Sequence, residues 1–415
     1  YSLIKESGPR SLTKIKKANH MNNQDIISVA SDYVAPTYGR YELALTKGKG
    51  CHVWDSDGKK YLDFVSGLAV CNLGHCHPKI VEALKNQAER LLHVSNLYHI
   101  EPQVQLAEKL CKNSFGDKVF FCNSGTEAVE SAIKLARKFS FKNFGENRHE
   151  IISFKMSFHG RTMASLAATG QEKYHKGFSP LLDGFKYAEF GNIKEVEKLV
   201  SKKTCAILVE PIQGEGGVNI PPENFLSNLR RICDENELLL IFDEVQVGMG
   251  RTGKLWAHEN YGVQPDIMSI AKGLAGGTAI GALISSNSAM AFEPGDHAST
   301  FGGNPLASAA GCAALDVITS AGFLDHVIEM GKYAIGQLEI IAEKYSIVKE
   351  VRGKGLIIGC EIDQDVSSIV LKAIENGILM NVALGNIVRL LPPLIVEKEM
   401  IDNFLEFLDS SLKEL

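Results

Sequence analysis

The sequence lacks long hydrophobic runs, internal repeats and an excess of basic charge. A membrane-spanning helix needs about 20 consecutive apolar residues, and no run approaches that length, so we expect no membrane partner. The formal net charge of the 415 residues is -5, and such a chain would repel the phosphates of nucleic acids. The absence of repeats and of Pro/Ser-rich linkers indicates interleaved units rather than separate domains along the chain.

Cysteines are few and show no pairing pattern. Nine are spread over the chain and none forms a CxxC pair, which is typical of a protein in a reducing compartment. The one dense group of possible metal ligands runs from Cys71 to His77 and includes His75 and Cys76. Because these ligands are adjacent pairs around a glycine, their spacing differs from that of zinc sites. We therefore expect no bound metal.

The first two dozen residues differ in composition from the rest. They hold several hydroxyl side chains and one acid, Glu6, against the basic residues Lys5, Arg10, Lys14, Lys16 and Lys17. A basic, hydroxyl-rich and acid-poor start is typical of an organelle transit peptide. We predict a targeting-like tail over residues 1–25, with a disordered basic arm of a cytosolic protein as the alternative.

Short apolar runs alternate with helical patterns along the remaining chain. Runs with apolar side chains on both faces, separated by helices, predict the strands of a mainly parallel sheet covered on both sides. The sequence therefore predicts an α/β fold, and from about Pro305 onward a separate smaller unit joined by the N-terminal segment. The runs are 118–121, 151–154, 205–209, 238–242 and 280–284.

Polar residues that could carry chemistry follow these runs directly. In an open α/β sheet, ligands bind outside the carboxyl ends of the strands. Residues 124–127 form a capping box whose helix N-terminus could bind phosphate, although a capped helix without a ligand has the same pattern. Asp243 and Gln246 follow another run, and a buried acid there needs a partner such as a cationic ring nitrogen. Lys272 ends a further run, where it is either a nucleophilic amine or a solvated charge.

A glycine motif in the same region is a poor match to a dinucleotide site. Gly248, Gly250 and Gly253 spell GxGxxG. However, residues 243–247 separate the strand from the first glycine, and no acidic residue stands about twenty positions further on. We therefore do not expect a nicotinamide cofactor.

The ordered motifs resemble those of the class III (omega-amino) aminotransferases of PLP fold type I, and within that class the acetylornithine aminotransferases. The resemblance extends from about residue 38 to about residue 394. It depends on Gly74-His-Cys-His-Pro78, Phe121-Cys-Asn-Ser-Gly-Thr-Glu-Ala128, Ser157-Phe-His-Gly-Arg-Thr162, Val209-Glu-Pro-Ile-Gln-Gly-Glu-Gly-Gly217, Phe242-Asp-Glu-Val-Gln246, Ala271-Lys272, Ser299-Thr-Phe-Gly-Gly-Asn-Pro305 and Val388-Arg-Leu-Leu-Pro-Pro393.

The resemblance implies a division of the chain and a role for each site residue. It implies an N-terminal segment over 26–74 that packs with the small domain, a large domain binding pyridoxal 5'-phosphate (PLP) over 75–304, and a small α+β domain over 305–415. Lys272 matches the Schiff-base lysine and Asp243 the partner of the pyridine nitrogen. The other implied cofactor contacts are Ser124, Gly125 and Thr126 at the phosphate, Phe158 stacked on the ring, Gln246 near the ring hydroxyl, and Thr300 at the phosphate of the neighbouring subunit of a homodimer. The implied substrate-binding residues are Tyr38, Arg161, Glu215 and Arg389.

The implied function is transfer of a terminal amino group. N2-acetylornithine and 2-oxoglutarate would give N-acetylglutamate 5-semialdehyde and glutamate by a ping-pong mechanism, in arginine biosynthesis. An ornithine or 4-aminobutyrate aminotransferase is the enzymatic alternative, and a regulatory protein of the same fold without catalysis is the other. The resemblance and the basic tail together favour the mitochondrial matrix, with the plastid second.

Overall fold

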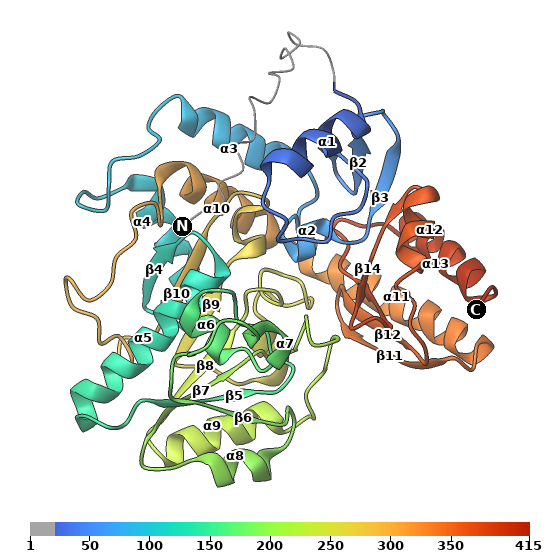
Figure 1. The fold of residues 1–415 in the computed structure, drawn as a ribbon. Helices are drawn as coiled ribbons and strands as arrows, with labels where there is room; N and C mark the ends of the chain where they lie inside the picture. Colours follow the sequence, from blue (N-terminus) through green and yellow to red (C-terminus); the bar gives the residue numbers. More distant parts are fainter. Residues whose placement is uncertain (1–20) are drawn as a thin grey trace, which may run out of the picture. The chain divides into compact units, whose positions relative to one another are not determined.

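The computed structural model describes residues 21–415 (Figure 1). These residues fall into two compact units. Among the described residues, the first comprises 21–47 together with 53–60, and the second comprises 48–52 and 61–415. Residues 1–20 of the predicted tail lie outside the described residues. Residues 23–25 begin helix α1 (Asn23–Tyr33).

Helix α1 organises the first unit. Its N-terminus is closed by a capping box in which Asn22 Oδ1 accepts from Asp25 N at 2.8 Å, an arrangement that satisfies backbone donors at a helix start. Asn23 then donates to Asp57 Oδ2 at 2.8 Å and accepts from Ala44 N at 2.9 Å. Strands β1 (Leu45–Lys49) and β2 (His52–Asp55) follow in the chain.

The second unit is built around a seven-stranded sheet. Its order is β4-β10-β9-β8-β7-β5-β6, and β10 runs antiparallel to both of its neighbours. The pairs among β5 to β9 are parallel. The strands are β4 (Lys118–Cys122), β5 (Glu150–Phe154), β6 (Phe185–Ala188), β7 (Thr204–Val209), β8 (Leu239–Asp243), β9 (Ile267–Ile270) and β10 (Gly281–Ser285). The predicted α/β fold with a mainly parallel sheet is confirmed.

Alternate residues of each strand face different helix layers, because side chains alternate across a sheet. Ile241 packs with helices α5 (Gly125–Phe144) and α6 (Met163–Ala168), whereas Phe242 packs with α8 (Ile193–Leu199) and α9 (Phe225–Glu235). Strands buried on both faces are therefore apolar throughout. The β4, β10 and β9 end of the sheet is covered by α3 (Pro78–Ala88), α4 (Glu101–Lys112) and α10 (Pro305–Ile318).

A second, antiparallel sheet forms near the C-terminus (Figure 1). Its order is β11-β12-β15-β14, and α11 and α13 pack against it. Helix α10 packs with the large sheet instead, and the domain boundary at residue 305 stays a prediction. The elements here are α11 (Phe323–Lys344), β11 (Val348–Lys354), β12 (Ile357–Ile362), α12 (Ile369–Glu375), β13 (Ile378–Leu379), β14 (Asn381–Ala383), β15 (Ile387–Leu390) and α13 (Lys398–Leu412).

The remaining elements are short. Strand β3 (Lys60–Asp63) pairs in parallel with β13 through Leu62 and Ile378. The others are α2 (Ser66–Ala69), α7 (Glu172–His175), η1 (Ala257–Tyr261) and η2 (Lys272–Ala275). Within residues 21–415 no single helix is long and apolar enough to cross a membrane, and only α10 and α11 together, bent by 69°, meet that criterion of length and composition.

Candidate active site

The carboxyl ends of five strands of the large sheet meet around one cavity of about 390 Å³. Parallel strands end at the same edge of a sheet, which is why residues far apart in the sequence meet here. Ser124 follows β4, Phe158 follows β5, Glu210 follows β7, Asp243 ends β8 and Lys272 follows β9. The structure thus brings together most of the residues that the sequence singled out.

The phosphate-binding candidates lie at the start of helix α5. Ser124 caps this 20-residue helix, and its Oγ accepts from Glu127 N at 3.3 Å. Gly125 packs so tightly that an added Cβ would lie 2.6 Å from Val245 Cγ1. The Thr126 hydroxyl lies 2.7 Å from Ser165 Oγ and accepts from Arg161 N at 3.1 Å. Helix N–H groups and hydroxyls at one rim of the cavity suit an anion.

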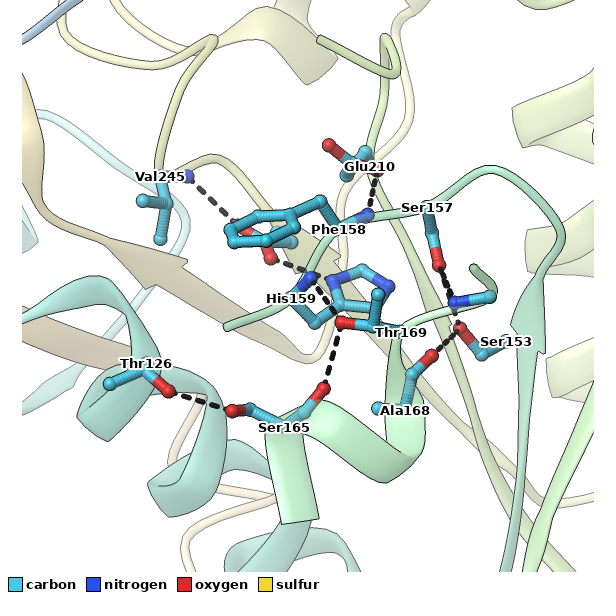
Figure 2. Close-up of polar contacts among 12 residues, drawn as sticks. Thr126, Ser153, Ser157, Phe158, His159, Ser165, Ala168, Thr169, Glu210 and Val245 are labelled. Atoms are coloured by element: carbon cyan, nitrogen blue, oxygen red, sulfur yellow. Dashed lines mark hydrogen bonds and ion pairs between the residues drawn. The ribbon is translucent and has the colours of Figure 1, made fainter. Parts of the chain in front are cut away.

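The loop after β5 places an aromatic ring and a histidine in the cavity. Figure 2 shows Phe158 and His159 side by side, with Glu210 to one side and the Thr126–Ser165 contact to the other. His159 N donates to Thr169 Oγ1 at 2.9 Å, and its ring Nδ1 lies 2.7 Å from Asp243 Oδ2. A buried carboxylate is costly without such donors.

Asp243 is therefore held from two sides. Its other oxygen, Oδ1, accepts from Val245 N at 3.0 Å, and only 4% of the residue is exposed. Three residues further on, Gln246 also lines the cavity, and its buried Oε1 has no hydrogen-bond partner among the described residues. Such an unpaired acceptor indicates a group missing from its surroundings.

Lys272 follows β9 and lines the same cavity. Its φ of 43° lies in the left-handed region, which is costly for a residue with a side chain and is often found at functional sites. Burial lowers the pKa of Lys272 below its ordinary 10.5, while Glu215 and Asp243 oppose this effect. The neutral amine is therefore easier to form here than in water.

Glu210 is a site residue for which the sequence analysis assigned no role. It is buried, and burial together with the nearby Asp243 raises its pKa well above the ordinary carboxyl value. Its Oε2 accepts from Phe158 N at 3.1 Å. The signal that identified Asp243, an acid directly after a buried apolar strand, applies equally to Glu210. His159 could not be found in this way, because its partner is 84 residues away.

Arg389 reaches the site from strand β15. It is 2% exposed, and its Nη2 lies 3.2 Å from Glu215 Oε1, which also accepts from Gln246 Nε2 at 3.3 Å. Asn381 Oδ1 accepts from Arg389 Nε at 3.0 Å and from its Nη2 at 2.7 Å, and was not expected from the sequence. Although burial alone would raise the pKa of Glu215, the charges of Arg389 and Lys272 lower it below its ordinary value.

The remaining predicted residues lie in different places. Arg161 lines the cavity, with its guanidinium 4.0 Å from the ring centre of Tyr174. Thr300 is exposed and lines an adjacent hollow with Asn123 instead of the cavity of Lys272. Tyr38 belongs to the first unit and is 74% exposed there. The roles of all these residues stay predictions.

Proteins of high sequence similarity cover nearly the whole chain. An acetylornithine aminotransferase of Caldanaerobacter subterraneus subsp. tengcongensis is 55% identical over 94% of this chain and 100% of its own length. One from Methanocaldococcus jannaschii is 50% identical over 95% of this chain and 100% of its own.

These relatives correct the expected location. They come from a bacterium and an archaeon, as do further acetylornithine aminotransferases at 45% to 49% identity. Such organisms have neither mitochondria nor plastids, so the expectation of the mitochondrial matrix or the plastid is wrong. The composition of a short basic segment was too weak a signal, since any solvated arm can be basic and hydroxyl-rich.

Two solved structures resemble this chain over nearly its whole length, and a family model matches most of it. The ornithine aminotransferase of Toxoplasma gondii ME49 has a TM-score of 0.91 at 32% identity, covering 95% of this chain and 96% of its own. The acetylornithine aminotransferase of Elizabethkingia anophelis has a TM-score of 0.85 at 36% identity, covering 95% of this chain and 100% of its own. The pattern of the family described as Aminotransferase class-III matches residues 33–412. The chain therefore belongs to the class III aminotransferases, enzymes that depend on PLP.

Proposed function

We propose that this enzyme moves the terminal amino group of N2-acetylornithine to 2-oxoglutarate, giving N-acetylglutamate 5-semialdehyde and glutamate in arginine biosynthesis. The observation that carries the proposal is the pairing of Arg389 with Glu215 beside Lys272. Arg389 can bind a substrate carboxylate, and Glu215 can pair with Arg389 when the substrate has no carboxylate for it. Such a pair suits an enzyme that alternates between two substrates of different charge. The names of relatives at 45% to 55% identity favour acetylornithine over ornithine or 4-aminobutyrate.

The cavity fits the cofactor. Its volume of about 390 Å³ lies within the usual range for small-molecule sites. The start of α5 would hold the phosphate, Phe158 would stack on the ring, and Asp243 would face the ring nitrogen. The unpaired Gln246 Oε1 would meet the ring hydroxyl, which can donate to it. When bound, PLP supplies an electron sink for the substrate carbon that carries the amine.

The chain's own groups supply orientation and proton transfer. Lys272 would anchor the cofactor, and its Nζ, once displaced, would remove the proton from the substrate carbon. The lowered pKa of Lys272 increases the fraction of neutral amine available for this step. His159 and Val245 N hold the Asp243 side chain in place, so that its carboxyl group is already oriented before the substrate binds.

Two arginines would distinguish the substrates. Glutamate carries two carboxylates and would use both Arg161 and Arg389, since planar guanidinium groups bind carboxylates with two hydrogen bonds. N2-acetylornithine carries one carboxylate, which Arg161 would bind. Arg389 would then keep Glu215, because a buried cation left without a partner costs several kcal/mol.

The active unit we propose is a homodimer with shared sites. The segment 91–104 exposes large apolar side chains, and Phe301, next to Thr300, is 60% exposed. Asn96 Nδ2 joins the two segments by donating to Ser299 O and Gly302 O, each at 3.0 Å. Contiguous exposed apolar surface supports an interface, and Thr300 on it could reach a neighbouring subunit. Sedimentation of the wild type should give a dimer, and Thr300→Ala should weaken cofactor binding without separating the subunits.

Rates with three amino donors test the substrate assignment. With 2-oxoglutarate as acceptor, kcat/KM should be highest for N2-acetylornithine and lower for ornithine and 4-aminobutyrate. Lys272→Ala should lose turnover, and borohydride should fix PLP to the wild type only. A higher kcat/KM for ornithine would overturn the acetylornithine assignment. A covalent adduct retained by the alanine variant would overturn the role of Lys272, and a wild type inactive on all three donors would favour the regulatory alternative.

A further inference from the structure

The glycine motif at residues 248–253 contains a fully buried arginine, Arg251. The motif lies in the loop after β8, downstream of Asp243 and Gln246. Arg251, inside it, is 0% exposed, and the structure gives it no carboxylate partner in an ion pair among residues 21–415. Burial lowers its pKa to about 9, so the guanidinium stays charged at neutral pH. A buried cation of this kind is costly unless its donors are used.

Arg251 uses the donors of Nη1 and Nη2 on segments that are far apart in the sequence, whereas its buried Nε has no hydrogen-bond partner among the described residues. Its Nη1 donates to Pro392 O at 2.6 Å and to Leu356 O at 3.0 Å, and its backbone O accepts from Leu356 N at 2.9 Å. Pro392 lies three residues after Arg389, just beyond β15, and Leu356 directly precedes β12. Strands β12 and β15 are hydrogen-bonded neighbours. Arg251 is thus hydrogen-bonded to the end of the strand pair that carries Arg389.

The Nη2 atom of Arg251 is linked through Asn72 to the residue next to Lys272. Arg251 Nη2 donates to Asn72 Oδ1 at 2.7 Å, and Asn72 Nδ2 donates back to Met249 O at 2.9 Å. Asn72 is 1% exposed and packs against Gly273, where an added Cβ would lie 2.4 Å from Asn72 Nδ2. Gly273 directly follows Lys272. Two buried side chains, Arg251 and Asn72, therefore connect the turn of Lys272 with the strand of Arg389.

We propose that Arg251 is a positioning residue that sets the spacing between Lys272 and Arg389, and with it the spacing between the reacting nitrogen and a bound substrate carboxylate. The inference rests on the proposed role of Arg389. The glycine motif then serves to place Arg251 in the interior. Gly250 has a φ of +88°, a conformation that glycine adopts without strain, and the turn it forms directs the Arg251 side chain inward. A shift of about 1 Å in such a spacing can cost about 100-fold in rate.

The test compares a substrate that needs the spacing with one that does not. Glutamate has a carboxylate for Arg389, whereas pentylamine is a primary amine with no carboxylate. Single-turnover absorbance changes of the bound cofactor give the rate constant divided by the apparent dissociation constant for each compound. We call the ratio of glutamate to pentylamine the carboxylate preference. Arg251→Lys should lower this preference about tenfold or more, mainly through weaker apparent binding of glutamate.

A matched control separates positioning from stability. Arg148 also donates its guanidinium to backbone carbonyls, those of Thr204 at 2.9 Å and of Asn236 at 2.6 Å, but at the amino ends of β7 and β8. Arg148→Lys should leave the carboxylate preference unchanged. Asn72→Ala, which cuts the link to the Lys272 turn but keeps the arginine, should lower the preference in the same direction as Arg251→Lys and serves if that variant folds poorly.

Arg389→Ala distinguishes failure of this inference from failure of the proposed function. If Arg389→Ala lowers the preference while Arg251→Lys and Asn72→Ala reduce both compounds equally, Arg251 is only structural and the inference is wrong. If Arg389→Ala leaves the preference unchanged, Arg389 does not bind the carboxylate, and both the proposed role and the inference are overturned.

Discussion

The substitution Glu215→Gln tests how one cavity accepts substrates with one and with two carboxylates. The Gln side chain keeps the size of Glu215 and an oxygen that can accept from Arg389, but it removes the negative charge. When N2-acetylornithine binds, Arg389 then has only neutral acceptors, namely Asn381 Oδ1, Gly214 O and the new amide oxygen at position 215. When glutamate binds, its own carboxylate would pair with Arg389, and a competing group has been removed.

The size of the effect follows from the geometry of the pair. At 3.2 Å and an effective dielectric constant of about 20, two unit charges attract by about 5 kcal/mol before desolvation. Desolvation offsets part of this attraction, and a hydrogen bond to a charged group has a net value of about 1.5–3 kcal/mol. We therefore expect the acetylornithine half-reaction to slow by about 10- to 150-fold. The glutamate half-reaction should be unchanged or show tighter binding.

Single-turnover spectroscopy of each half-reaction provides the measurement. Glu150→Gln is the control, because Glu150 pairs with Lys186 at 2.7 Å with a side chain 16% exposed, at the amino end of β5. It should affect neither half-reaction. Equal slowing of both half-reactions by Glu215→Gln, or of neither, would refute the reasoning.

Three further substitutions test the site. In the cofactor-free protein, Lys272→Met should raise the melting temperature. The folded pKa of Lys272 is lowered from 10.5, so this lysine lowers stability most at neutral pH and less as the pH rises toward 10.5; a gain that grew with pH would contradict this. Gly160→Ala should weaken cofactor binding, measured by dialysis, because the new Cβ would lie 2.2 Å from Thr126 Oγ1 at a φ of +137°; Gly177→Ala, with φ +87° and open space, is the control. His159→Ala should weaken cofactor binding about tenfold or more, because the 2.7 Å contact to Asp243 is lost. Unchanged retention of the cofactor would show that His159 does not support Asp243 in this way.

The sequence indicated the large sheet and the residues at its edge because both depend on local patterns. Strands β7 to β10 are buried along their whole length, and the polar residues stand at or just beyond the strand ends, as with Asp243 at the end of β8 and Lys272 after β9. Once the strands are parallel, their carboxyl ends must meet. The same reasoning could have included Glu210, which the sequence analysis passed over.

Contacts between distant segments were decided only by the tertiary structure. The pair His159–Asp243 joins residues 84 positions apart, and no pattern in either segment predicts it. The glycine motif is the clearest case, since its spelling suggests a dinucleotide turn while the fold uses it to bury Arg251 among the carbonyls of Leu356 and Pro392. Local periodicity determines which elements form and where their polar ends lie. The order of the strands and the packing between the sheets determine which distant side chains come within hydrogen-bond or ion-pair distance.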